Sequence, residues 1–281
     1  MANIHGVSDI QDPLLSNTNR IDALLLGGFS MGSADQARRE TFLKMLKTLI
    51  CPYFIKKSFS SAICLFNILI FIICLLYGST PGKFLSPSQE TLILFGANSN
   101  SKLEEHEVWR WLTAVFLHSD IKHITFNTIT FLMIGTRVEF GTGMKNTILV
   151  YFISAIGGNV ISSCMNSHSV AVGASTGICG VLGANIGWIT LNWNHLASNQ
   201  NRNYTMISLV IWCILMLMIG QVESNIDNWG HFGGLFTGFT LGIYLFDSIG
   251  RVSQKEKNLK LGCLILTAVF IVGGIIGFYY R

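Results

Sequence analysis

Long apolar segments recur along this chain and are separated by short polar stretches. Each segment is close to the roughly 20 residues that a membrane-crossing helix needs. The pattern predicts crossings at about 61–78, 120–136, 146–164, 174–192, 205–221, 229–247 and 261–279. We therefore expect an all-α membrane protein with seven transmembrane helices.

The composition agrees with this expectation. Of the 281 residues, 50% are hydrophobic and only 12% are charged, against about 25% charged in ordinary soluble proteins. The net charge of +4 is small, and the basic residues lie at the edges of apolar segments instead of forming an aromatic-interleaved patch. This favours a lipid bilayer as the surroundings and argues against nucleic acid as a partner.

The distribution of charge predicts how the chain is oriented. Basic residues concentrate in cytosolic loops of membrane proteins. If the amino terminus is cytosolic, the cytosolic ends and loops contain Arg137, Lys145, Arg202, Arg251, Lys255, Lys257 and Lys260. The long first outer loop, about 79–119, carries both signs, and long loops weaken the rule. We expect a luminal or extracellular carboxy terminus.

Two mostly polar regions flank the predicted bundle. Residues 1–60 are expected to form a cytosolic amino-terminal region, partly flexible and without a cleavable signal peptide. Its apolar patch at 24–29 is too short to span a bilayer. Residues 249–260 are expected to form a basic cytosolic linker, followed by the last helix and the carboxy terminus at 261–281.

Four polar residues stand out because they lie near the starts of three crossings that run in the same direction. His123 and Asn127 lie in the second crossing, Ser175 opens the fourth, and His231 lies just inside the sixth. Polar residues at such depth are costly and normally face a bundle interior or a water-filled cavity. The spacing therefore predicts one shared site at a single membrane depth.

Stripes of small residues suggest how two of these helices pack. Such residues let helix backbones approach closely. They recur every four positions as Ser175, Cys179, Gly183 and Gly187 in the fourth crossing, and as Gly230, Gly234, Gly238 and Gly242 in the sixth. If the stripes face each other, Ser175 meets His231. The alternative is that both stripes serve packing alone and that His231 is a hydrogen-bonded interior histidine.

The residue types suit nucleophilic catalysis. A serine hydroxyl is a poor nucleophile until a base removes its proton, and a histidine within reach can be that base. Asp227 lies four residues before His231 and either orients its ring or, as we favour, belongs to the outer loop. The backbone N–H of Ser175 at a helix start, with His123 and Asn127 on one helix face, would supply donors to a developing oxyanion.

Several motifs over about 63–248 resemble, in order, those of the rhomboid family of intramembrane serine proteases. They are Trp109-Arg110, His123-Ile124-Thr125-Phe126-Asn127, the Gly135, Glu139 and Gly143 series, Gly173-Ala174-Ser175, and Trp229-Gly230-His231-Phe232-Gly233-Gly234. The resemblance implies a six-helix catalytic core over 61–248, with Ser175 as nucleophile, His231 as base, and His123 and Asn127 at the oxyanion.

The resemblance also implies structural roles for Trp109, Arg110, Gly135, Glu139, Gly143, Gly173, Gly230 and Gly234. A seventh helix is similar to the six-plus-one arrangement of eukaryotic secretory-pathway rhomboids, and the Gly-Ala-Ser-Thr sequence is similar to that of apicomplexan parasites. Thr176 replaces a glycine common in bacterial members. Cys179 stands where members often carry an aromatic ring on which the histidine stacks.

The expected function is cleavage of transmembrane helices of single-pass proteins near the outer or luminal face, releasing their ectodomains, with no cofactor and no metal. The expected substrates are surface or adhesion proteins, and the expected location is the secretory pathway, a secretory organelle or the plasma membrane.

Other functions fit the sequence less well. A catalytically silent rhomboid-like protein that binds membrane clients would typically lack the serine or the histidine, and this chain has both. A channel or transporter is disfavoured by the absence of mid-membrane charges and of an internal repeat. The sequence has no HExxH zinc motif, and its aspartates fall at helix ends, in loops or in the amino-terminal region.

Overall fold

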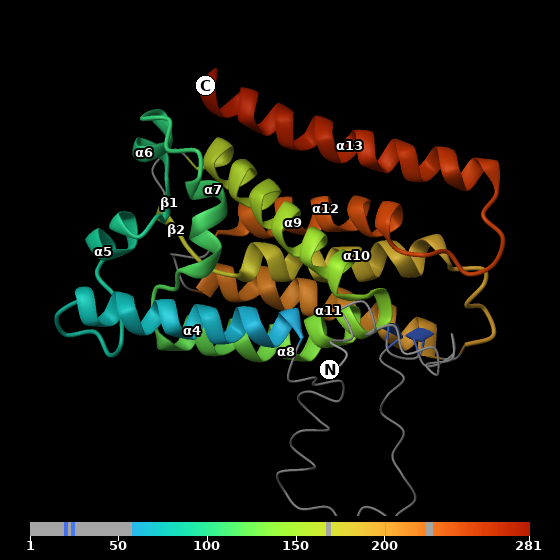
Figure 1. Ribbon diagram of the computed structural model, residues 1–281, viewed down its shortest axis with the longest axis horizontal. Coiled ribbons are helices and arrows are strands. Elements are labelled where there is room, and N and C mark those ends of the chain that lie inside the picture. The colour runs from blue at the N-terminus through green and yellow to red at the C-terminus, as the bar shows by residue number, and fades with distance from the viewer. Residues whose placement is uncertain (1–19, 22–23, 26–57, 167–169, 200, 223–226) are drawn as a thin grey trace, which may run out of the picture.

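The computed structural model describes residues 20–21, 24–25, 58–166, 170–199, 201–222 and 227–281. Long helices dominate it, and they follow the predicted crossings (Figure 1). They are α4 (Phe59–Tyr77), α8 (Ile121–Thr142), α9 (Met144–Met165), α10 (Ser175–Leu191), α11 (Asn201–Val222), α12 (Asn228–Leu245) and α13 (Gln254–Tyr279). Over these described residues, the fold is an all-α membrane bundle of six long helices with a seventh, α13, after it.

The surface of the bundle suits lipid. Among the described residues, α4, α9 and α13 are long and apolar enough to cross a membrane by length and composition, and α10 is a shorter apolar helix. Helix α8 contains the charged residues Lys122, Arg137 and Glu139, and α12 is rich in glycine. Large apolar side chains such as Leu69, Ile211 and Val269 are exposed on the outer faces of α4, α11 and α13. So much exposed apolar surface is typical of a membrane-facing protein.

Two helix boundaries differ most from the sequence prediction. Helix α8 continues past 136 to Thr142, where Gly143 adopts a φ of +88° that favours glycine. Helix α13 begins at Gln254, inside the predicted linker 249–260, because the Ser253 hydroxyl accepts a hydrogen bond from the Glu256 N–H at 3.2 Å. Much of the predicted linker is therefore helical.

Helices α10 and α12 make the most extensive contact in the bundle, and α9 packs on both. A methyl group added to Gly234, Gly238 or Gly242 of α12 would overlap the backbone of α10. The contacted residues on α10 are Thr176, Gly180 and Ala184. The predicted close packing of these two helices is therefore present, but the face of α10 differs from the predicted one. The α12 glycines meet residues one position after the predicted stripe, whose Gly183 and Gly187 lie against Leu235 and Phe239 instead.

The outer helices are attached by specific contacts. Helix α13 lies along α9 and α12 (Figure 1), with the hydroxyls of Thr240 and Thr267 2.6 Å apart. Helix α4 is held to α8 by Glu139, whose carboxylate accepts hydrogen bonds from the backbone N–H groups of Phe59 at 2.7 Å and Ser60 at 2.9 Å. A buried carboxylate thus satisfies the N–H groups at the start of α4.

The segment between α4 and α8 folds over one end of the bundle, where its short elements gather in Figure 1. They are α5 (Gln89–Leu94), β1 (Asn98–Ser99), α6 (Asn100–Glu104), α7 (Arg110–Thr113) and the 3-10 helix η1 (Ala114–Phe116). Strand β1 pairs antiparallel with β2 (Val170–Ala171), with Asn98 opposite Ala171. This pairing fixes the chain just before α10.

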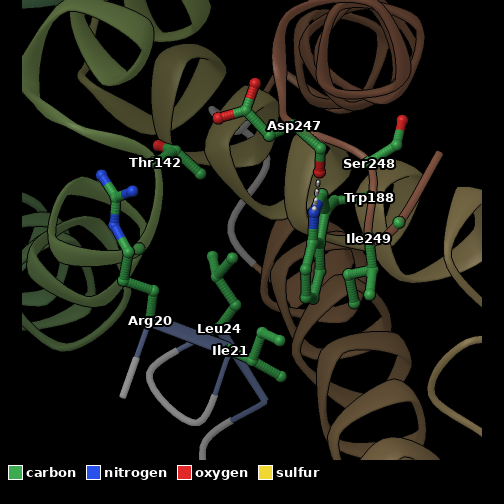
Figure 2. A pocket seen from close by; sticks show the side chains of 10 residues that line it. Arg20, Ile21, Leu24, Thr142, Trp188, Asp247, Ser248 and Ile249 are labelled. Atoms are coloured by element: carbon green, nitrogen blue, oxygen red, sulfur yellow. Dashed lines mark hydrogen bonds between the residues drawn. The ribbon is translucent and has the colours of Figure 1, made fainter. Parts of the chain in front are cut away.

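A few amino-terminal residues pack into the opposite end of the bundle. Leu24 and Leu25 are buried, and the Leu24 carbonyl accepts a hydrogen bond from Asn185 Nδ2 at 3.2 Å. Arg20, Ile21 and Leu24 line a cavity of about 190 Å³ beside Trp188 (Figure 2). Part of the region 1–60 therefore belongs to the bundle, whereas most of the region predicted to be flexible lies outside the described residues.

Candidate active site

Ser175 and His231 meet at the end of the bundle that the β1–β2 pair covers. Ser175 is the first residue of α10, and His231 lies in the first turn of α12. The Oγ of Ser175 is 2.8 Å from the Nε2 of His231. Both residues are buried, at 8% and 5% exposure. The contact depends on the close approach of α10 and α12, because neither side chain is long.

The backbone before Ser175 is held in an unusual conformation. Gly173 has a φ of +131°, which side-chain-bearing residues rarely adopt. Its N–H donates to the Ala114 carbonyl at 3.0 Å. The chain then enters α10, so the first N–H groups of that helix, including that of Ser175, have no carbonyl of the same helix to bind. They are placed to bind negative charge next to the serine hydroxyl.

Asp227 caps α12 and makes no hydrogen bond to the imidazole of His231 among the described residues. Its Oδ1 accepts hydrogen bonds from the Gly230 N–H at 2.9 Å and from Asn166 Nδ2 at 3.2 Å. Among the described residues, the Nδ1 of His231 has no hydrogen-bond partner. The geometry is therefore that of a pair and not of a triad. Nε2 can accept the serine proton when the neutral ring carries its own proton on Nδ1.

His123 and Asn127 lie against the backbone just before Ser175. A methyl group on Gly173 would lie 2.8 Å from His123 Nε2 and 3.6 Å from Asn127 Nδ2. Asn127 is 2% exposed, and its Nδ2 has no hydrogen-bond partner among the described residues. A buried donor left unpaired is costly in a resting protein. It suits a group that binds an oxygen whose charge grows during a reaction.

The residues expected to be structural are distributed over the bundle, and Gly135, Glu139 and Gly143 lie toward the end of α8 that is farther from the site. Arg110 joins parts of the covering segment, donating from Nη1 to the carbonyls of Ile93 at 2.6 Å and Ala97 at 3.1 Å. The Trp109 side chain, in contrast, is 55% exposed. A methyl group on Gly135 would lie 2.9 Å from the Ser60 hydroxyl, so this glycine lets α4 approach α8.

One buried residue beside the site escaped the sequence reasoning. His118 is 1% exposed, and its ring lies 5.2 Å from that of His123, edge to face at 71°. Burial, together with the neighbouring His123, places the pKa of His118 well below its ordinary value, so it is neutral. The available signal was a second histidine five positions before His123.

Two further points concern the chemistry at this end. Cys179, one turn after Ser175, is buried on α10, and the printed hydrogen bond of the His231 ring is to the Ser175 hydroxyl. Over the described ranges, no group of three His, Cys, Asp or Glu side chains is arranged to hold a metal ion.

The family model and the most similar known proteins point to the same family. The family model described as "Rhomboid domain" matches residues 105–248. The chain is 32% identical to "Rhomboid-like protease 2" of Toxoplasma gondii over 230 residues, which are 79% of this chain and 80% of the relative. It is 33% identical to "Rhomboid-like protease 1" of the same organism over 82% of this chain and 75% of the relative.

A bacterial protein is also similar. "Rhomboid protease GluP" of Bacillus subtilis is 34% identical over 197 residues, covering 69% of this chain but 36% of the relative. These relatives, together with the apolar helices, indicate an integral membrane protein and an intramembrane protease. The chain therefore belongs to the rhomboid family and is of the type found in apicomplexan parasites.

Proposed function

We propose that this protein is a serine endopeptidase that cleaves transmembrane helices of single-pass membrane proteins near the outer or luminal face and releases their ectodomains. Ser175 is the nucleophile and His231 is the base. The observation that carries this proposal is the 2.8 Å contact between Ser175 Oγ and His231 Nε2, buried where three helices begin. A serine is activated by a base in this position.

The first half of the reaction forms an acyl-enzyme. His231 Nε2 removes the proton of Ser175 as Oγ attacks the carbonyl carbon of the scissile peptide bond. The carbonyl oxygen becomes an oxyanion and accepts hydrogen bonds from the Ser175 N–H, Asn127 Nδ2 and His123. When the intermediate collapses, the C–N bond breaks and the imidazolium of His231 returns its proton to the leaving amine.

The second half repeats these steps with water. His231 removes a proton from a water molecule that attacks the acyl carbon, and the same donors bind the second oxyanion. The C–Oγ bond then breaks, the proton passes from His231 to Ser175, and the carboxylic product leaves. A dyad is sufficient, because Nδ1 of His231 keeps its proton throughout.

The buried position of Ser175 restricts the substrate. A peptide bond inside a regular helix is enclosed by side chains and by its own hydrogen bonds, so the backbone must extend before Oγ can reach it. We therefore propose substrates whose helices contain small or helix-breaking residues, as single-pass surface or adhesion proteins can. The charge pattern supports a cytosolic amino terminus and a luminal or extracellular carboxy terminus, in the secretory pathway, a secretory organelle or the plasma membrane.

The test is cleavage of a panel of co-expressed single-pass proteins. The wild-type chain should release ectodomains, whereas Ser175→Ala and His231→Ala should release none while remaining inserted. The matched control is Ser253→Ala, which removes a hydroxyl from the cap of α13. Ectodomain release by Ser175→Ala at the wild-type rate would contradict the mechanism.

A second readout separates an enzyme from a silent client-binding protein. A fluorophosphonate probe forms a covalent bond with an activated serine, so it should label the wild-type chain and not Ser175→Ala. An intact chain that captures membrane clients but neither cleaves them nor reacts with the probe would favour the binding protein.

A further inference from the structure

The backbone that leads into Ser175 is supported by elements too short to keep a fixed position alone. Strand β2 ends two residues before Gly173, and it pairs with β1, which is equally short. The carbonyl that binds the Gly173 N–H belongs to Ala114, at the junction of the short helices α7 and η1. Isolated two-stranded pairs and single helical turns are marginal in water. Both supports of Gly173 therefore need an anchor elsewhere in the fold.

Helix α9, which ends beside β1 and α7 (Figure 1), anchors the first support through Asn98 of β1. The Asn98 side chain is buried, and its Nδ2 donates to the Asn159 carbonyl of α9 at 3.1 Å. Its Oδ1 accepts from the hydroxyl of Ser163, one turn later on α9, at 2.9 Å. Asn98 lies opposite Ala171 in the strand pair. Its hydrogen bonds to α9 therefore hold β2 as well as β1.

The same two residues of α9 anchor the second support. Asn159 Nδ2 donates to the carbonyl of Trp111 in α7 at 2.7 Å. Trp111 Nε1 donates to the Ser163 hydroxyl at 3.1 Å. Ala114, whose carbonyl binds the Gly173 N–H at 3.0 Å, follows Trp111 by three residues. Both the backbone and the side chain of Trp111 are thus bound to α9, one turn before the residue that holds Gly173.

These four side chains form one buried network. Asn98, Trp111, Asn159 and Ser163 are each at most 6% exposed. The Ser163 hydroxyl joins them, since it accepts from Trp111 and donates its hydrogen toward Asn98 and the Asn159 carbonyl. Buried polar groups are costly unless they are paired, and paired networks rigidify what they join. Hydrogen bonds are also directional, so the network fixes the orientation of both supports and not only their proximity.

The position of Gly173 decides whether the oxyanion donors converge. The Ser175 N–H follows Gly173 by two residues, and a methyl group on Gly173 would lie 2.8 Å from His123 Nε2 and 3.6 Å from Asn127 Nδ2. A displacement of this backbone therefore changes the distance between the Ser175 N–H and the two side chains. Donors must meet one developing oxyanion at hydrogen-bonding distance, so such a displacement slows the reaction.

We propose that Asn98, Asn159 and Ser163 are positioning residues that anchor the backbone of Gly173 from two sides and so align the oxyanion donors. This inference rests on the proposed protease function. The three residues act through β2 and η1 and not by contact with the substrate. Their removal lowers kcat and leaves KM unchanged, because the donors bind charge that develops only in the transition state.

The mildest variant is Ser163→Ala, which removes one hydroxyl. Trp111 Nε1 and Asn98 Oδ1 then lose their shared partner. We expect kcat to fall about tenfold to a hundredfold with KM unchanged, because a small misplacement can cost about a hundredfold. Asn159→Ala, which releases the Trp111 carbonyl, should act in the same direction. Thermal unfolding in detergent shows that each variant is folded. A wild-type kcat in folded Ser163→Ala and Asn159→Ala would overturn the proposal.

Asn100→Ala is the matched control for Asn98→Ala. Asn100 is also a buried asparagine that binds the last turn of α9, donating to the Ser163 carbonyl at 3.2 Å. It belongs to α6, however, and not to either support of Gly173. Both variants should lower the unfolding temperature, whereas only Asn98→Ala should lower the kcat of the folded protein. Equal losses of kcat in the two variants would show a general structural role and overturn the inference.

A double-variant cycle separates positioning from stability. Gly173→Ala already displaces the backbone that the network holds. Adding Ser163→Ala to Gly173→Ala should therefore lower kcat by no more than about twofold, whereas two independent effects would multiply. Multiplied losses would overturn the inference. Failure of the proposed function is distinct, because it appears as cleavage that does not depend on Ser175.

Discussion

Ser175 Oγ lies 2.8 Å from His231 Nε2, although the two residues are 56 positions apart and belong to different helices. The distance is set by glycines. Those on α12 leave room for the backbone of α10, with Gly238 packed against Gly180. The geometry of the dyad is therefore a property of helix packing along the whole interface and not of the first turns alone.

Gly238→Ala should separate the two helices. Its methyl group would overlap the backbone of Gly180, which cannot move aside as a flexible side chain can. We expect a loss of stability of about 1–3 kcal/mol and a lower kcat, because small misplacements of catalytic groups are costly. Thermal unfolding in detergent and substrate cleavage measure the two effects.

Gly262→Ala on α13 is the control, since nothing lies within 4 Å of the added methyl group. Equal stability and equal kcat of the Gly238→Ala and Gly262→Ala variants would contradict this account.

Gly173→Ala should damage the site more than the fold. The φ of +131° is unfavourable for alanine, and the methyl group would lie 2.8 Å from His123 Nε2. Displacing donors from the oxyanion costs about 10²–10³ in kcat. Gly82→Ala is the matched control, because Gly82 has a φ of +76° with open space around it. A Gly173→Ala enzyme with the kcat of Gly82→Ala would refute this role.

Asp227→Asn should retain most of the cleavage activity. Asparagine can cap α12 as aspartate does, and Asp227 accepts from Gly230 and Asn166 while His231 Nδ1 has no hydrogen-bond partner among the described residues. A loss of kcat of a hundredfold or more at unchanged stability would instead indicate that the carboxylate supports the base.

The same variant predicts a change in the pH dependence of stability. Burial raises the pKa of the Asp227 carboxyl above its ordinary value. The folded protein therefore binds this proton more tightly than the unfolded chain. The resulting stability is present below the ordinary pKa and is lost as the pH rises through the raised one. Asp227→Asn should lack this loss, which thermal unfolding across the acidic pH range measures; parallel curves for the two proteins would argue against it.

Leu25→Ala should destabilise the bundle from the end opposite the site. Leu25 is fully buried, and its carbonyl accepts a hydrogen bond from the hydroxyl of Thr205 on α11. Truncating a buried leucine costs about 2–5 kcal/mol. Leu76→Ala, at a side chain that is 84% exposed, is the control. A Leu25→Ala protein as stable as Leu76→Ala would show that this segment does not belong to the folded core.

The positions of the helices were predictable because their signal is local. A run of apolar residues of sufficient length needs no partner to be recognised. Boundaries were less predictable, since they depend on caps. Helix α13 begins inside the expected linker because Ser253 caps it. Helix α8 extends beyond its predicted end because its C-cap is Gly143.

The candidate site was only partly predictable. Ser175 and His231 followed from their depth and from the small-residue stripes. The structure packs α10 against α12, but the α12 stripe faces Thr176, Gly180 and Ala184 and not the predicted stripe of α10. The cap formed by Asp227 and the burial of His118 were not foreseen, because they depend on which atoms a side chain reaches. The same holds for the contact of Ser119 with His123.

By itself, the sequence determined that this is a membrane bundle with four polar residues at one depth, because the lengths of the apolar segments and the types of the residues can be read directly from the sequence. Only the tertiary structure decided which atoms meet: Nε2 of His231 with Ser175, Nδ1 of His123 with Ser119, and Leu24 with the far end of the bundle. These contacts join positions far apart in the chain, or depend on side-chain rotation, and neither is encoded in local periodicity.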